Sequence, residues 1–168
     1  DVLNFFRMLG VPIREAYGLT EASGATTMQP SDRSPVGTVG VPYRGVDLRL
    51  ADDGEILIRG DVVFRGYFRN EAATREAIDS DGWLHTGDVG RWEDAPTGRE
   101  LRIVDRKKDI MITAGGKNIT PSEIENALKF SAYLKEAVVV ADRRPFVAAL
   151  IQIDADTVGK WAEEQGLA

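Results

Sequence analysis

The chain is organised around two stretches, WLHTGD at residues 83–88 and LRIVDRKKDIMITAGGK at residues 101–117. In the first stretch, Thr86-Gly87-Asp88 forms a polar turn. Its glycine lets the backbone approach a ligand closely, and its aspartate offers two acceptor oxygens that suit a vicinal diol such as a ribose. The same residue types are also common in ordinary turns. The turn therefore indicates a nucleotide contact only together with other features.

Apolar residues alternate with other residues on both sides of a basic turn in the second stretch. Leu101 and Ile103 precede the turn at 106–109, and Ile110 and Ile112 follow it. This period of two predicts two short antiparallel strands joined by a charged connection of four residues. A connection of this kind is exposed and mobile, so it is a candidate hinge.

Composition limits the classes of function. The 168 residues hold 21 Lys and Arg against 27 Asp and Glu, a net charge of −6, which argues against a nucleic-acid surface. Without cysteine there is no thiol nucleophile, disulfide or cysteine zinc site, and a single histidine, His85, excludes a multi-histidine metal site within this chain. No apolar run approaches the roughly twenty residues of a membrane helix, and no signal-peptide pattern is present, so we expect a cytoplasmic protein.

The N-terminal two thirds reads as strand-rich. We expect a helix that ends at Gly10, a short strand at 11–16 that delivers Tyr17, and a polar loop at 23–27. Further β-rich runs at 36–40, 46–50, 55–59 and 62–67 predict a small antiparallel barrel or sheet, with a hairpin at Asp53-Gly54. A helix capped by Asn70 should cover 70–79, and residues 93–99 should form a surface loop.

The C-terminal third reads as a small mixed unit. A capping box at 120–123 begins a helix, and runs at 135–141 and 146–153 form a hairpin whose apolar residues suggest burial on both faces. Asp154 or Asp156 then caps a last helix, which ends at Gly166 and has an inward face made by Val158, Trp161 and Ala162.

The pentapeptide Tyr17-Gly18-Leu19-Thr20-Glu21 carries side chains suited to a nucleotide. The Tyr17 ring could stack on a purine, the Thr20 hydroxyl could donate to a phosphate, and Glu21 could hold Mg²⁺. A helix cap followed by a solvated glutamate explains the same residues. For His85, a structural hydrogen bond is the favoured interpretation.

Four motifs in register resemble those of the adenylate-forming (AMP-binding) enzymes, in particular the acyl-CoA synthetases. They are YGLTE at 17–21, WLHTGD at 83–88, IVDRKKD at 103–109 and GGKNITPSEIE at 115–125. The resemblance extends from about Leu9 onward, and RPFVAALIQID at 144–154 is most similar to the long-chain fatty acid branch.

The resemblance implies an α+β fold. Residues 1–105 would be the β-rich end of a large N-terminal AMP-binding domain, with an antiparallel barrel or sheet. Residues 106–168 would begin a mobile α+β lid domain, here truncated, that rotates about a hinge at Lys108.

The resemblance also assigns site residues. Thr20 and Glu21 would be catalytic, with Thr20 on the adenylate phosphate and Glu21 on Mg²⁺, while Tyr17 lies near the adenine with Gly18 beside it. The ribose would be held by Asp88, and Arg106 would contact the ribose or a phosphate. The loop formed by Gly115 and Gly116 would line a channel for coenzyme A.

The activity implied for the parent protein converts ATP, a long-chain fatty acid and coenzyme A into acyl-CoA, AMP and pyrophosphate. The chain starts at Asp1, lacks the upstream glycine-rich phosphate loop and lacks the lid lysine, so we expect a fragment that is inactive without the missing N-terminal part. Loading of a carrier protein, or a non-catalytic binding or regulatory module, are the alternatives. Acyl chain length, oligomeric state and peripheral membrane contact are left open.

Overall fold

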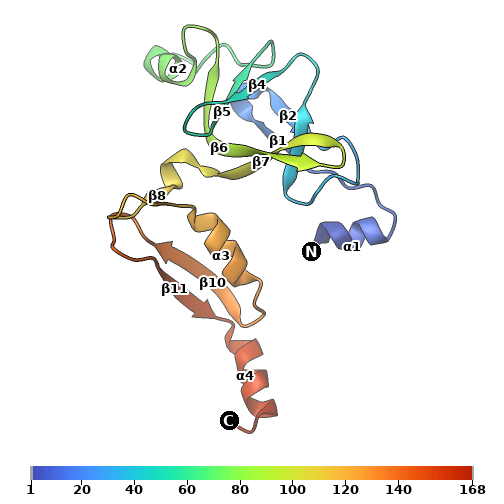
Figure 1. Ribbon diagram of the computed structural model, residues 1–168, viewed down its shortest axis with the longest axis vertical. Coiled ribbons are helices and arrows are strands. Elements are labelled where there is room, and N and C mark those ends of the chain that lie inside the picture. Colours follow the sequence, from blue (N-terminus) through green and yellow to red (C-terminus); the bar gives the residue numbers. More distant parts are fainter. Residues whose placement is uncertain (1, 168) are drawn as a thin grey trace. The chain divides into compact units, whose positions relative to one another are not determined.

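A computed structural model describes residues 2–167 and divides them into two compact units, one ending at Lys107 and the other starting at Lys108 (Figure 1). This division lies two residues beyond the boundary expected at 105/106. Asp1 and Ala168, the outer ends of the two expected domains, lie outside the described residues. We describe each unit by itself.

The first unit is built on one seven-stranded sheet in which every neighbouring pair is antiparallel. The strand order is β1-β2-β3-β7-β6-β5-β4. Two short helices, α1 and α2, and a 3₁₀ turn complete the unit. The elements are α1 (Val2–Met8), β1 (Ala16–Leu19), the 3₁₀ turn η1 (Thr20–Ala22), β2 (Gly24–Met28), β3 (Thr38–Pro42), β4 (Asp47–Leu50), β5 (Glu55–Arg59), α2 (Glu71–Ala77), β6 (Leu84–Ala95) and β7 (Gly98–Arg106).

The core of this unit lies along the central strands of the sheet. Ile56 and Ile58 of β5, Leu84 of β6 and Leu101 of β7 are at most 1% exposed. Burying one such aliphatic side chain contributes about 1.5–3 kcal/mol. The packed strands therefore form the rigid frame on which the polar residues of the sheet are held.

A buried network of polar side chains connects the segments on and around β2, β3 and β7. The Gln29 amide nitrogen donates to the carbonyl oxygens of Pro35 and Thr38, and its amide oxygen accepts from Arg7. The fully buried Glu100 carboxylate accepts from Ser34, Thr38 and Thr97. Burial by itself raises the pKa of Glu100, but these hydroxyl donors outweigh it and hold the pKa below its usual range.

Several predicted elements of the first unit are confirmed. The Asp53-Gly54 turn joins β4 to β5, with Gly54 at φ +84°. The Asn70 side chain accepts a hydrogen bond from the backbone N–H of Ala73 and so caps α2. Trp83, which directly precedes β6, is buried.

Other predictions for this unit were wrong. Tyr17 lies inside strand β1 rather than after a strand at 11–16, and residues 23–27 form no loop, because Gly24–Met28 pairs with β1 as β2. Thr26 and Thr27 are β-branched and fully buried there, which suits a strand. Residues 62–67 form no strand, and the loop expected at 93–99 shrinks to the turn between β6 and β7.

The prediction of a hairpin across the basic turn was also wrong. Leu101 and Ile103 belong to β7, which pairs with β3 and β6. Ile112 belongs to β8 (Met111–Ile112), which pairs with β9 (Asn118–Ile119), and a 3₁₀ turn, η2 (Lys107–Asp109), separates β7 from β8. The period of two identified the strands but carries no information about their partners.

The second unit consists of two small hairpins and two helices. Its core is formed by Ile119, Val139 and Ala141, against which Met111 and Ile124 pack. In Figure 1 helix α3 runs alongside β10, and Glu125 of α3 accepts a hydrogen bond from the backbone N–H of Val139. The elements after β9 are α3 (Pro121–Lys129), β10 (Leu134–Val140), β11 (Ala148–Ile153) and α4 (Ala155–Glu164).

Predictions for the second unit hold in outline but fail on burial. The β10–β11 hairpin and the Asp154 cap are confirmed, but all six residues of β11 are exposed, so the hairpin is not buried on both faces. Trp161 meets Tyr133 edge-on, yet no residue of α4 is buried. Helix α3 begins at Pro121, within the capping box expected at 120–123, but Thr120 makes no side-chain cap bond. Within residues 2–167 no helix has the length and apolar character to cross a membrane.

Candidate functional site

Four predicted site residues meet on the first unit although they come from different strands and turns. Glu21, Asp88 and Arg106 line one pocket of about 130 Å³, together with Leu19, Tyr67, Leu84, His85 and Thr86. Tyr17 joins them through a hydrogen bond from its hydroxyl to Asp88. Asp88 and Arg106 are opposite each other in the register of β6 and β7, so the sheet itself sets their pairing.

Asp88 is the centre of this cluster. Its side chain is almost buried; Oδ2 accepts from the Tyr17 hydroxyl at 2.6 Å and Oδ1 accepts from Nε of Arg106 at 2.9 Å. Each carboxylate oxygen keeps a further lone pair, so the group can still accept from a diol. The Arg106 side chain is more than half exposed, and its guanidinium offers further donors to an anionic ligand.

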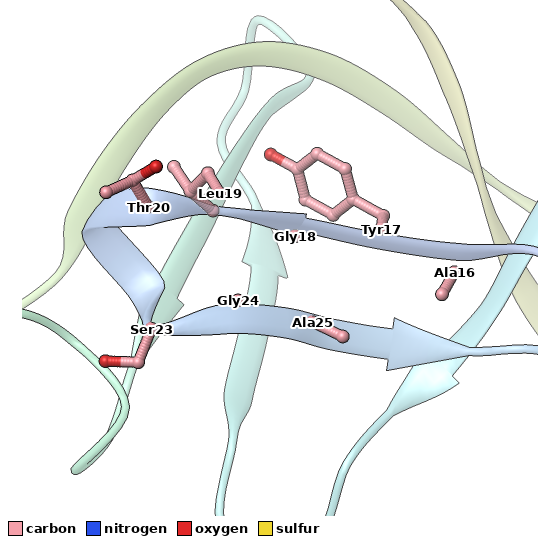
Figure 2. Close-up of a pocket in the computed structure, with 8 residues that line it drawn as sticks. All are labelled: Ala16, Tyr17, Gly18, Leu19, Thr20, Ser23, Gly24 and Ala25. Atoms are coloured by element: carbon pink, nitrogen blue, oxygen red, sulfur yellow. The ribbon is translucent and has the colours of Figure 1, made fainter.

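Tyr17 acts in this cluster as a neutral donor. Burial, followed by the hydrogen bond to Asp88, raises the pKa of Tyr17 far above its usual range. Tyr17 also lines an open depression of about 610 Å³ that runs along β1 and β2. In Figure 2 the side chains of Tyr17 and Leu19 project from the same side of β1, and Thr20 follows at the end of the strand.

Gly18 has a structural explanation of its own. A Cβ atom at this position would collide with the backbone carbonyl of Gly24 on the neighbouring strand, where the register of β1 and β2 shifts. Glycine is therefore required by the close approach of two backbones. A contact between Gly18 and a nucleotide stays a prediction.

Glu21 lies in the 3₁₀ turn η1 and is held by a residue that the sequence did not single out. Its Oε1 accepts a hydrogen bond from the Tyr67 hydroxyl at 2.9 Å, and its backbone oxygen accepts from the N–H of Phe64. The hydrogen bond to Glu21 raises the pKa of Tyr67. Tyr67 lies 46 residues away along the chain, and no motif links the two positions.

Glu21 fits one way of binding Mg²⁺. Among residues 2–167 no group of three or more His, Asp or Glu side chains is arranged to hold a metal ion. Mg²⁺ is often bound through one or two carboxylates together with the phosphates of a substrate. The hard carboxylate oxygens of Glu21 suit that mode, in which the nucleotide supplies most of the ligands.

The Thr86-Gly87-Asp88 turn is a bulge in β6. Gly87 has φ +70°, Thr86 donates to the carbonyl of Ile56, and the N–H of Asp88 donates back to the Thr86 hydroxyl. His85, beside the bulge, lies 3.3 Å from Glu55 and 3.6 Å from Asp79, which matches the structural role expected for it.

The remaining predicted residues belong to the second unit. Lys108 is its first residue, within η2. Gly115 and Gly116 form the turn between β8 and β9, where Gly116 has φ +78° and its N–H donates to the carbonyl of Thr113. Turn geometry accounts for Gly116 without a ligand, so the hinge and the coenzyme A channel stay predictions.

Comparison with known proteins identifies the family to which the chain is similar. The model of the AMP-binding enzyme family matches residues 1–68, and that of the AMP-binding enzyme C-terminal domain matches residues 108–167. A long-chain fatty acid CoA ligase of Mycobacterium bovis is 46% identical over 160 residues, which is 95% of this chain and 26% of that protein. A human long-chain fatty acid CoA ligase is 38% identical over 180 residues, 99% of this chain and 25% of that protein.

A solved structure shows the same fold. The O-succinylbenzoate coenzyme A synthetase of Bacillus subtilis in complex with AMP superposes with a TM-score of 0.76 at 28% identity, over 97% of this chain and 36% of that one. The same enzyme in complex with ATP and magnesium ion also gives a TM-score of 0.76. The chain spans about a quarter of the length of the curated relatives it matches. Two models of AMP-binding enzymes together cover most of its residues, and the two fatty acid CoA ligases above match nearly the whole chain: the chain belongs to the AMP-binding, adenylate-forming enzyme family.

Proposed function

We propose that this chain is part of a longer protein that activates a long-chain fatty acid with ATP and transfers it to coenzyme A. The products would be acyl-CoA, AMP and pyrophosphate. The observation that carries the proposal is the cluster of Tyr17, Glu21, Asp88 and Arg106, which gathers a diol acceptor, a guanidinium and a hard carboxylate around adjoining pockets.

The geometry suggests a division of roles within the cluster. Asp88 would accept hydrogen bonds from the ribose hydroxyls, and Arg106 would donate to the ribose or a phosphate. Tyr17 holds Asp88 in place through its hydroxyl and lines the depression where an adenine could lie. Holding the reactants in one orientation is a large part of the catalysis of such a transfer.

Charge is the second requirement. Thr20 lines the depression and would donate its hydroxyl to a phosphate oxygen, while Glu21 would bind Mg²⁺. The ion would neutralise the negative charge of the phosphates and stabilise the charge that develops as the carboxylate attacks. For the second step we propose that the unit starting at Lys108 turns about that residue and that Gly115-Gly116 lines the path of coenzyme A.

The test is pyrophosphate release by the longer protein with ATP, Mg²⁺ and a long-chain fatty acid, with and without coenzyme A. We expect release that depends on the fatty acid, followed by acyl-CoA formation when coenzyme A is present. Release that ends at enzyme-bound adenylate at every coenzyme A concentration would indicate a carrier-protein acceptor. Absence of acid-dependent release with acids of several lengths would contradict the proposal.

A further inference from the structure

None of the roles proposed above involves Glu55, a buried acidic residue. Glu55 begins β5 and is 5% exposed. Its Oε1 accepts from the backbone N–H of Gly87 at 3.0 Å, and its Oε2 accepts from the Lys107 ammonium at 2.8 Å and lies 3.3 Å from Nδ1 of His85. A buried carboxylate costs folding free energy unless it is paired, so each of these contacts calls for an explanation.

The contact with Gly87 is explained by the register of the sheet. Leu57 is opposite His85 and Glu55 is opposite Val89. The interval between these two pairs therefore spans two residues along β5 but four residues along β6. The bulged residues Thr86, Gly87 and Asp88 therefore have backbone groups that cannot all enter the ladder. The Thr86 hydroxyl accepts from the N–H of Asp88, and the Glu55 carboxylate accepts from the N–H of Gly87.

The contact with Lys107 is explained by charge. The Lys107 ammonium lies between Glu55 at 2.8 Å and Asp53 at 2.7 Å, and Lys107 directly follows Arg106. A nearby cation keeps a buried carboxylate ionised, and an ionised carboxylate is the stronger acceptor for the Gly87 N–H. Burial by itself raises the pKa of Glu55, but the hydrogen bonds from Lys107, Gly87 and His85 bring the pKa below its usual range.

We propose that Glu55 is a positioning residue that fixes the Gly87 peptide, and with it Asp88, in the geometry required to hold a ribose, with Lys107 as its counter-ion. The part that concerns the ribose rests on the proposed function. Because Lys107 and Arg106 are neighbours, the same ion pair also ties the end of β7 to the bulge of β6.

The first test uses this 168-residue chain and needs no nucleotide. Amide hydrogen exchange measured by NMR should show the Gly87 N–H exchanging about tenfold faster in Glu55→Ala, because a hydrogen bond to a charged group is lost. The amides of Ile58 and Leu84, which pair in the adjoining ladder, should keep their protection. Glu55→Gln retains an acceptor oxygen and should exchange more slowly than Glu55→Ala. A wild-type exchange rate for Gly87 in folded Glu55→Ala would overturn the proposal.

A second measurement serves if Glu55→Ala does not fold. In the unsubstituted chain the Gly87 amide proton shift should follow the acid titration of Glu55, and in Lys107→Met that titration should move to higher pH because a cation beside the carboxylate is lost. Lys107 and His85 contact the Glu55 carboxylate directly, whereas Asp53 contacts the Lys107 ammonium and the backbone N–H of Glu55. Asp53→Asn therefore serves as the control with a smaller displacement. A Gly87 shift that does not respond to acid would overturn the proposal.

The link to the ribose is tested in the longer protein. Glu55→Gln should raise the KM for ATP severalfold and leave kcat nearly unchanged, since the displaced group binds substrate rather than the reacting atoms. A KM within error of wild type would refute the positioning of Asp88. If the longer protein shows no ATP-dependent activity at all, the proposed function fails, while the exchange of Gly87 still decides what Glu55 does.

Discussion

Strands β5 and β11 show how differently the two units are packed. In β5 four of five residues are buried, whereas in β11 all six are exposed, although both strands are rich in aliphatic residues. Asp88 and Arg106 of the first unit project from β6 and β7, and each of these strands is paired with a strand on both sides. The glycine turn of the second unit projects from a two-stranded hairpin that is paired with no other strand among residues 2–167. Precise placement of a ligand is therefore expected from the first unit.

The largest predicted effect is on the free energy of unfolding, and it tests the difference in packing between the two units. Leu101→Ala removes a fully buried side chain of the first unit and should lower the free energy of unfolding by about 2–5 kcal/mol. Leu150→Ala makes the same change on a β11 residue that is 69% exposed and should stay within about 0.5 kcal/mol. Urea unfolding followed by circular dichroism measures both. Equal losses would mean that β11 is covered in solution, and the contrast would not hold.

The next effect concerns the metal. Glu21→Gln in the longer protein removes the carboxylate charge and should raise the Mg²⁺ concentration for half-maximal pyrophosphate release by about tenfold or more. Glu71→Gln changes an exposed glutamate that pairs with Arg75 on α2 and serves as the matched control. The Mg²⁺ dependence of initial rates distinguishes the two variants. An unchanged dependence in Glu21→Gln would remove Glu21 from the site.

Tyr17 should make the stability of the first unit fall with rising pH in the alkaline range. Its pKa is raised in the folded chain, so above about pH 10 the unfolded chain loses a proton that the folded chain retains. Stability from this group is complete below that pH and falls as the pH rises, by up to about 1.4 kcal/mol per pH unit. Urea unfolding from pH 9 to 11 should show a steeper fall for the wild-type chain than for Tyr17→Phe. Parallel curves would contradict a half-buried, hydrogen-bonded phenol.

The smallest effect is that of Tyr67. Tyr67→Phe removes one hydroxyl, the donor to Glu21, and keeps the ring that packs against Phe64. We expect the Mg²⁺ requirement to rise about threefold to tenfold, because one hydrogen bond of ordinary strength is lost. Tyr43→Phe, which removes a hydroxyl that contacts Met28, is the control. An effect as large as that of Glu21→Gln would show that Tyr67 does more than orient the carboxylate.

Local patterns predicted the parts of the site that short motifs carry. The Thr86-Gly87-Asp88 turn and the pentapeptide from Tyr17 to Glu21 line neighbouring pockets. It was their resemblance to a family that singled them out, because the chemistry of each motif alone also fitted an ordinary turn or a helix cap. Tyr67 and Glu55 could not be found in this way. They act on residues 46 and 32 positions away, and only the pairing of strands brings them there.

Strand partners and burial were similarly beyond local patterns. The alternation around Leu101 and Ile112 located two strands but assigned them to one hairpin, whereas the structure places them in different sheets. The apolar run of β11 suggested burial, but an apolar sequence shows only that burial would stabilise the strand. Whether another element of this chain packs on that strand depends on the tertiary structure.

The central claim, that Asp88 holds the ribose, is tested most directly by comparing ATP with 2′,3′-dideoxy-ATP in the longer protein and in its Asp88→Asn variant. Calorimetric titration gives the four affinities. We predict that the wild-type protein binds ATP at least about tenfold more tightly than the dideoxy analogue and that most of this preference is lost in Asp88→Asn, because the charged acceptor of the two hydroxyls is gone. The same preference in both proteins would contradict the assignment.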